Sequence, residues 1–189
     1  MTTKTDSTHW VLTLSCPDQP GIVRAVAGTL ADQGGNITES KQFGDAGTNL
    51  FFMRVQVEAS ASYEELEEAI KPLARRFDMT WNLDVVGRPI RTLIMVSKAA
   101  HALNDLLFHQ HAQDLPIEIV AVVGNHTDLA ELTEFYGKTF HHIPVTKDNK
   151  PEAEAQLLAL VKELDVELVV LARYMQVLSD NLCTELTGR

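Results

Sequence analysis

The chain has 189 residues, enough for one large domain or two small ones. Hydrophobic residues make up 45% and charged residues 22%, an ordinary globular balance, and a formal net charge of -10 argues against a nucleic-acid-binding surface. Only two cysteines are present, so no disulfide framework is implied, and the polar N-terminus and short apolar runs predict a cytoplasmic protein without a signal peptide or membrane span.

The first block, residues 8–87, alternates between β-forming and helical segments. A strand is expected at 10–16, and a helix follows from residue 22 to the glycines at 34 and 35. Two strands at 36–44 and 48–59 flank a turn. The next helix begins at Tyr63, with Ser62 and Glu65 as a capping box and Pro72 interrupting or ending its regular part. With a last strand at 79–87, the order βαββαβ predicts a ferredoxin-like domain.

The second block, residues 90–189, follows a short polar hinge, "GRPIR". Strands alternate with helices throughout it, which predicts a Rossmann-like parallel sheet covered on both faces. The fold class is therefore α+β followed by α/β. The expected strands are 92–97, 117–124, 140–145 and 166–172, and the expected helices are 99–112, 128–137 and 152–164.

No metal or dinucleotide site is expected. His141 and His142 are adjacent on a strand and point to opposite faces, and the helical histidines at 109 and 111 do not share a face. His101 and Asp105, four residues apart, favour a surface pair. The first turn of the second block, "SKAAHALNDLL", contains no glycine, which excludes NAD, FAD and P-loop nucleotides as cofactors.

The loop "CPDQPGI" joins the first strand to the first helix. The N–H groups at the helix start can receive a carboxylate, although a tight turn without a ligand fits the residues equally well. The βαββαβ order with "DQPGIV" in this loop resembles the ACT domain, an amino-acid-sensing module. The resemblance implies a homo-oligomer paired edge to edge, with a small amino acid such as glycine or methionine at the seam. The implied effector-binding residues are Asp18, Gln19, Gly21, Ile22 and Asn36.

The second block resembles the N-terminal half of the formyltransferase fold, and most closely the formyltetrahydrofolate deformylases. The stretches "VVGNH-x-DL", "YG-x-x-FHHIPVT" and "LVVLARYMQVLS" follow that family's order and spacing, although Ala102 stands where the family often has Cys. The resemblance implies hydrolysis of 10-formyltetrahydrofolate to tetrahydrofolate and formate, which feeds purine synthesis, without a cofactor. Backbone groups and apolar walls would hold the pterin ring of the substrate. The implied substrate-binding residues are Arg173, Tyr174, Met175, Gln176, Val177 and Leu178.

The family's pattern continues beyond the position of Arg189, with an Asn-x-His-His-Ser strand and a later Asp. The resemblance therefore implies a C-terminally truncated chain that contains none of the catalytic residues and is inactive as a 189-residue polypeptide. One alternative is a non-catalytic amino-acid-binding module that pairs with a full-length subunit. A second is a folate-dependent formyltransferase, although glycinamide ribonucleotide transformylases carry a glycine-rich phosphate loop where this chain reads "SKAAHA".

Overall fold

The computed structural model describes residues 7–189 and divides into two compact units, one ending at Gly87 and the other beginning at Arg88. Each unit has its own hydrophobic core. None of the helices in the described part of the chain has the length and apolar character required to cross a bilayer. The cytoplasmic location stays a prediction.

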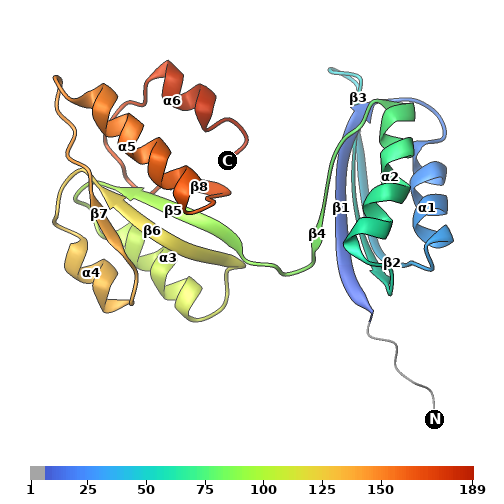
Figure 1. Cartoon of the computed structure of the whole chain (residues 1–189), viewed down its shortest axis with the longest axis horizontal. Helices are drawn as coiled ribbons and strands as arrows, with labels where there is room; N and C mark the ends of the chain where they lie inside the picture. The colour runs from blue at the N-terminus through green and yellow to red at the C-terminus, as the bar shows by residue number, and fades with distance from the viewer. Residues whose placement is uncertain (1–6) are drawn as a thin grey trace, which may run out of the picture. The chain divides into compact units, whose positions relative to one another are not determined.

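The first unit is a four-stranded antiparallel sheet in the order β2-β3-β1-β4, with both helices on one face (Figure 1). The predicted βαββαβ order is confirmed. Strands β1 and β3 occupy the centre of the sheet, and β2 and β4 form its edges. The elements are β1 (Thr8–Pro17), α1 (Ile22–Asp32), β2 (Asn36–Asp45), β3 (Leu50–Ala59), α2 (Tyr63–Phe77) and β4 (Thr80–Val85).

Alternation along β1 explains why this segment is a half-buried strand. Leu12 is fully buried against the helices, whereas its neighbour Thr13 is exposed on the opposite face. Successive side chains of a strand point to opposite faces, so every second residue enters the core. Val26 of α1 and Leu66 of α2 close this core from the helical side, and both are fully buried.

Helix α2 begins with the predicted capping box. The Ser62 hydroxyl accepts the Glu65 N–H at 3.3 Å, and the Glu65 carboxylate accepts the Ser62 N–H at 2.8 Å. The prediction that Pro72 interrupts or ends the regular helix is wrong, because α2 continues to Phe77. Proline removes one helical hydrogen bond, but burial of the apolar stripe on the sheet offsets that loss. The stripe consists of Leu66, Ile70, Leu73, Ala74 and Phe77.

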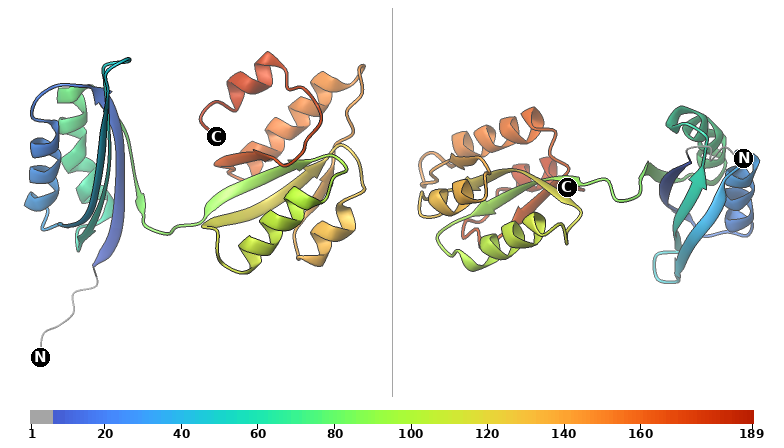
Figure 2. Two further views of the ribbon diagram at one scale, coloured as in Figure 1. Left: turned by 180° about the vertical axis from the view of Figure 1, so that it is seen from behind. Right: turned by 90° about the horizontal axis from the view of Figure 1, so that it is seen from below.

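The second unit is a parallel sheet in the order β7-β6-β5-β8, covered on both faces as predicted. Helices α3 and α4 lie on one face, and α5 and α6 lie on the other (Figures 1 and 2). Each face has its own apolar cluster. The elements are β5 (Ile90–Val96), α3 (His101–His111), β6 (Ile117–Gly124), α4 (Ala130–Phe135), β7 (Phe140–His142), α5 (Lys150–Glu163), β8 (Leu168–Leu171) and α6 (Asp180–Glu185).

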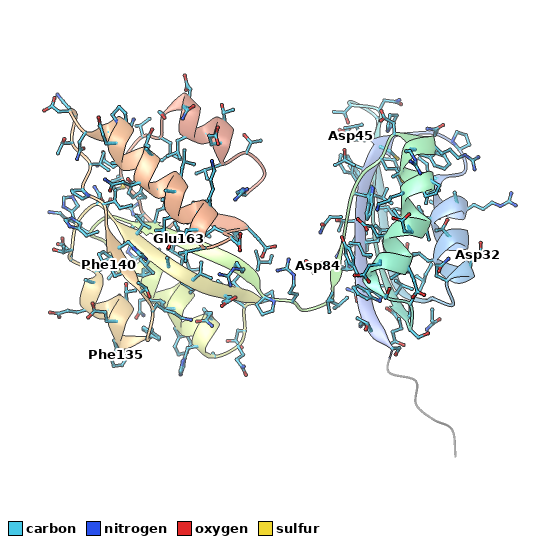
Figure 3. All side chains as sticks on the ribbon, viewed as in Figure 1. Asp32, Asp45, Asp84, Phe135, Phe140 and Glu163 are labelled. Atoms are coloured by element: carbon cyan, nitrogen blue, oxygen red, sulfur yellow. The ribbon has the colours of Figure 1, made fainter. Side chains whose placement is uncertain are left out.

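Strand β7 is shorter than the sequence predicts. It ends at His142, because its partner strand, β6, ends at Gly124, and the Ile143 N–H donates the last hydrogen bond to the Gly124 carbonyl at 2.9 Å. Phe140 stays on the side of the sheet that α3 and α4 cover (Figure 3). Ile143 instead packs in the cluster beneath α5 and α6. Residues three apart on an extended chain point to opposite faces, so the alternation of β7 continues through Ile143 although its pairing with β6 ends at His142.

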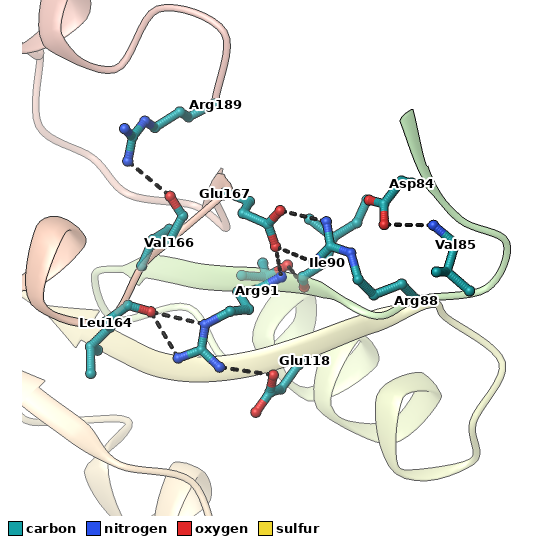
Figure 4. A network of polar contacts seen from close by, with 11 residues as sticks. Asp84, Val85, Arg88, Ile90, Arg91, Glu118, Leu164, Val166, Glu167 and Arg189 are labelled. Atoms are coloured by element: carbon teal, nitrogen blue, oxygen red, sulfur yellow. Dashed lines mark hydrogen bonds and ion pairs between the residues drawn. The ribbon is translucent and has the colours of Figure 1, made fainter. Parts of the chain in front are cut away.

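A network of charged groups holds the start of β8 to β5 (Figure 4). The Glu167 carboxylate accepts two hydrogen bonds from the Arg88 guanidinium, at 2.6 and 2.8 Å, and a third from the Arg91 N–H at 3.1 Å. The Arg91 guanidinium donates to the Leu164 carbonyl at 2.8 and 3.0 Å. The hydrogen bonds from Arg88 are the main reason why the pKa of Glu167 falls to about 2.

We expect Glu167→Gln to lower the free energy of unfolding of the second unit by about 1 kcal/mol at pH 7, a value discounted for partial exposure of the pair. A carboxylate whose pKa is depressed on folding stabilises the fold above its ordinary pKa of 4.5, and this contribution is lost as the pH falls toward 2. Urea unfolding of the wild type and of Glu167→Gln at pH 7, 5 and 3 measures the contribution of this carboxylate to the free energy of unfolding. The control Glu118→Gln affects one exposed ion pair and should cost under about 0.5 kcal/mol. A difference between wild type and Glu167→Gln that does not shrink at low pH would contradict this assignment.

Candidate functional site

The carboxyl ends of the parallel strands form the candidate site of the second unit. Strands β5 and β6 end at Val96 and Gly124, and each is followed at once by a buried polar residue, Ser97 and Asn125. Residues 173–178, which we call the edge segment, follow β8 and have no regular secondary structure. Ligands of open α/β sheets bind at this edge. The order of elements therefore brings the segment predicted to bind substrate to the expected edge.

A pocket lies between the edge segment and the sheet face covered by α5 and α6. Its volume is about 10 Å³, room for no more than one water molecule, whereas small-molecule sites typically reach several hundred Å³. The pocket is therefore closed in this structure, and a ligand ring would enter only if lining side chains moved. The lining residues are Met95, Val123, Ile143, Val145, Lys150, Ala153, Glu154, Leu157, Tyr174, Gln176, Val177, Leu178 and Leu182.

Four of the six predicted substrate-binding residues line the pocket, and two do not. Tyr174, Gln176, Val177 and Leu178 line the pocket, whereas Arg173 and Met175 do not. Met175 is 68% exposed, and Arg173 adopts a left-handed backbone conformation with φ 60°. Val177 is 83% exposed although it borders the pocket, so it can move without disturbing the core.

The backbone of the edge segment offers more hydrogen-bonding groups than its side chains. Within the described chain, no carbonyl of residues 173–178 accepts a hydrogen bond from protein, and the Met175 N–H is the only backbone donor between Tyr174 and Leu178 that is engaged. Unpaired backbone groups beside an apolar pocket can match the donors and acceptors of a flat heterocycle. The substrate-binding role of the segment stays a prediction.

Helix α5 contributes two charged residues to the pocket, Lys150 and Glu154, which the sequence analysis missed. The Glu154 carboxylate accepts the Ser179 N–H at 3.0 Å and is also hydrogen-bonded by the Ser179 hydroxyl. The Lys150 ammonium is 3.9 Å from the same carboxylate. Burial, with a smaller contribution from the charge of Glu154, raises the pKa of Tyr174 above its ordinary value. The carboxylate therefore fixes the start of α6 beside the pocket.

Ser97 and Asn125 join the strand ends to the edge segment. The Ser97 hydroxyl donates to the Asn125 side-chain carbonyl at 2.7 Å and accepts the Met175 N–H at 3.0 Å. Ser97 is 4% and Asn125 6% exposed. Both residues lie in stretches singled out by the sequence analysis. Their position at the carboxyl end of a buried strand was the signal that could have identified them.

The remaining predictions for the second unit concern a metal site, a histidine–aspartate pair and a phosphate loop. Among residues 7–189, no group of three or more histidine, cysteine or acidic side chains could hold a metal ion. Asp105 lies 3.7 Å from His109, one turn further along α3, rather than forming the surface pair predicted with His101. The turn "SKAAHA" before helix α3 contains no glycine, and Ala100 occupies the N-cap without a side-chain cap.

The predicted effector loop of the first unit is a tight turn into α1. Gly21 occupies the N-cap with φ 96°, a conformation that favours glycine, and the Asp18 N–H donates to the Asn49 carbonyl at 2.9 Å. Gln19 is exposed, whereas Ile22 is 2% exposed and its side chain belongs to the core.

The expectation that Asn36 lies near this loop is wrong for a single chain. Asn36 is the first residue of β2 and pairs with Glu58, at the far end of the sheet from the loop. The loop lies instead by the other end of β2, where a Cβ built on Gly44 would be 3.2 Å from an Asp18 carboxylate oxygen. The whole length of the strand β2 therefore separates Asn36 from Asp18.

Family comparisons match the two units separately. Residues 10–75 match the ACT domain, and residues 90–189 match the formyl transferase family. Formyltetrahydrofolate deformylase from Corynebacterium sp. (strain P-1) is 51% identical over 183 residues, which are 95% of this chain and 64% of that protein. The enzyme of the same name from Bacillus subtilis (strain 168) is 40% identical over 172 residues, or 89% of this chain and 57% of that protein.

Solved structures lead to the same family. The crystal structure of formyltetrahydrofolate deformylase from Burkholderia mallei superposes with a TM-score of 0.94 at 40% identity, covering 96% of this chain and 65% of that chain. This chain thus spans less than two thirds of the length of these relatives.

Proposed function

The chain belongs to the formyl transferase family, with an ACT domain ahead of the formyl transferase part, and from this premise we propose that it serves the hydrolysis of 10-formyltetrahydrofolate to tetrahydrofolate and formate. The 51% identity to a formyltetrahydrofolate deformylase over nearly the whole chain carries this proposal. Supply of formate to purine synthesis would be its metabolic role.

The proposed reaction transfers the formyl group to water. Water adds to the formyl carbon, the carbon–nitrogen bond breaks, the folate nitrogen takes a proton, and formate leaves. The residues described here would bind and orient the substrate. The free carbonyls of the edge segment would accept hydrogen bonds from the pterin, and Val177 and Leu178 would cover its apolar surface. The reaction needs donors that stabilise the tetrahedral oxyanion, each worth about 10²–10³ in rate.

We propose that these reactive groups lie outside residues 7–189. The ionisable residues that line the pocket are Lys150, Glu154 and Tyr174, and the Glu154 carboxylate is already engaged by Ser179. No histidine lines this pocket in the described chain. The 189-residue polypeptide would then bind the folate without deformylating it.

We expect the 189-residue polypeptide to bind a hydrolysis-resistant 10-formylfolate analogue and to release no formate from 10-formyltetrahydrofolate. A second polypeptide, extended at its C-terminus with the remaining segment of the Corynebacterium relative, should release formate at least about 10³-fold faster, because it would supply the oxyanion donors. Calorimetry and a formate assay measure the two properties. Equal formate release by both polypeptides would refute the proposal that the reactive groups lie outside residues 7–189. Failure of both polypeptides to bind the analogue would refute the proposed function.

Assays on the same two polypeptides distinguish two alternative functions. A folate-dependent formyltransferase would transfer formyl to an added amine, such as glycinamide ribonucleotide, faster than to water. The absence of a glycine-rich turn before α3 disfavours this alternative. A purely regulatory amino-acid-binding module would bind an amino acid but not the folate analogue.

We further propose that the ACT domain forms a homodimer through β2 and binds a small amino acid, glycine or methionine, at the seam. β2 is an edge strand that is exposed along nearly its whole length. Antiparallel pairing about a two-fold axis at Ser40 would place Glu39 opposite Lys41 of the partner subunit, a favourable cross-strand charge pair. The same register would bring Asn36 of the partner subunit opposite Gly44, and hence close to Asp18. The effector loop and Asn36 would then meet across the seam.

We expect sedimentation equilibrium to show a dimer that Lys41→Glu weakens about tenfold, because two like-charge pairs would replace two opposite-charge pairs. Glycine or methionine at the seam would bind the dimer in preference to the monomer and so tighten it. Lys162→Glu, a charge reversal on α5 of the second unit, is the matched control and should leave association unchanged. Equal weakening by both variants would argue for a net-charge effect instead of β2 pairing.

A further inference from the structure

Few hydrogen bonds hold the edge segment to the rest of the second unit, although Tyr174 and Leu178 pack against the apolar cluster beneath α5 and α6. Before it, the Ala172 N–H donates to the Met95 carbonyl at 2.9 Å, and after it, Ser179 is bound by Glu154. Between these points, the bond from the Met175 N–H to the Ser97 hydroxyl is the only backbone hydrogen bond to another part of the described chain. The backbone of Met175, in the middle of the segment, therefore depends on one hydroxyl for its hydrogen bond.

The Ser97 hydroxyl is itself oriented. Its hydrogen is donated to the Asn125 side-chain carbonyl at 2.7 Å, so its lone pairs are directed to other donors, and the Met175 N–H occupies one of them at 3.0 Å. Ser97 and Asn125 extend from the ends of adjacent strands, β5 and β6, whose backbones are fixed by the sheet. Both side chains are more than nine-tenths buried, so water competes weakly for these bonds.

From this geometry we propose that Ser97 is a positioning residue, which Asn125 orients and which fixes the Met175 amide so that the backbone carbonyls of the edge segment are pre-arranged for the folate. The inference rests on the proposed function of that segment and deepens it. A preformed segment lowers the cost of ordering on binding, because the chain need not be immobilised by the ligand. Neither Ser97 nor Asn125 lines the pocket, so both act through the Met175 backbone.

Ser97→Ala removes the acceptor, and we expect the Met175 amide to exchange its hydrogen about 5- to 20-fold faster, as the loss of one buried hydrogen bond predicts. Binding of the hydrolysis-resistant 10-formylfolate analogue should weaken by a similar factor. Thr92→Val is the matched control. It removes the buried hydroxyl of a β5 residue, which donates to the Ile90 carbonyl near the end of β5 that is far from Ser97. This control should affect melting temperature but neither Met175 exchange nor analogue binding.

Asn125→Ala provides a second test, which keeps the proposal falsifiable if Ser97→Ala does not fold. It should raise Met175 exchange less than Ser97→Ala does, and the double variant should match Ser97→Ala alone, because both residues act through one bond. Unchanged Met175 exchange in Ser97→Ala would overturn the proposal, as would faster exchange with unchanged analogue affinity. If the wild-type protein binds no analogue, the proposed function fails, and exchange in the ligand-free protein still decides whether Ser97 fixes the segment.

Discussion

Gly124→Ala is expected to destabilise the second unit by about 2–3 kcal/mol, which is a typical cost of forcing an extra methyl group into a packed core. A Cβ at this position would lie 2.4 Å from the Phe140 ring and 2.7 Å from the His126 carbonyl oxygen. The ring could turn aside, but the carbonyl oxygen belongs to the backbone and could move only with the chain after β6. The substitution therefore disturbs the same strand end that supports Asn125.

Thermal unfolding followed by circular dichroism measures this effect. For a unit of this size, the expected loss lowers the melting temperature by about 10–20 °C. Gly137→Ala is the matched control in the same unit, because a Cβ there meets nothing within 4 Å and only the positive φ of 69° opposes it. That control should cost about 1 kcal/mol. Equal losses of stability in the two variants would mean that the chain at His126 moves away from the added methyl group at little cost in free energy.

Much of the fold could be predicted because local patterns and tertiary packing agree. In β1, the alternation that buries Leu12 and exposes Thr13 is visible in the sequence, and so is the capping box that begins α2 at Ser62. The errors occurred where packing overrides a local signal. Pro72 resembles a helix end, yet the buried stripe of α2 keeps the helix intact past it. At β7 the reverse holds, because apolar residues suggested a longer strand than the end of its partner β6 at Gly124 allows.

The candidate site could be predicted only where it is continuous in sequence. The edge segment is one stretch of chain, so its location followed from its motif and from the strand before it. Glu154 and Lys150 reach the pocket from a helix, where their spacing resembles that of any solvated face. Asn36 was wrongly predicted to lie near the effector loop, because β2 places it at the far end of the sheet from Asp18. Distances between loops require the strand register, which composition and periodicity do not supply.

The two units should unfold independently, and a core truncation in each tests this. Leu12 in β1 and Leu93 in β5 are both 0% exposed, and they belong to different apolar clusters. Each Leu→Ala substitution is expected to cost about 3 kcal/mol, from lost burial and the cavity left behind. If the hinge transmits no stability, Leu12→Ala should lower one calorimetric transition by about 10 °C or more and leave the other in place, and Leu93→Ala should do the reverse. Domains with separate cores are expected to behave in this way. If either substitution lowered both transitions equally, the units would be one cooperative body, and the ACT domain would be able to influence the edge segment through stability alone.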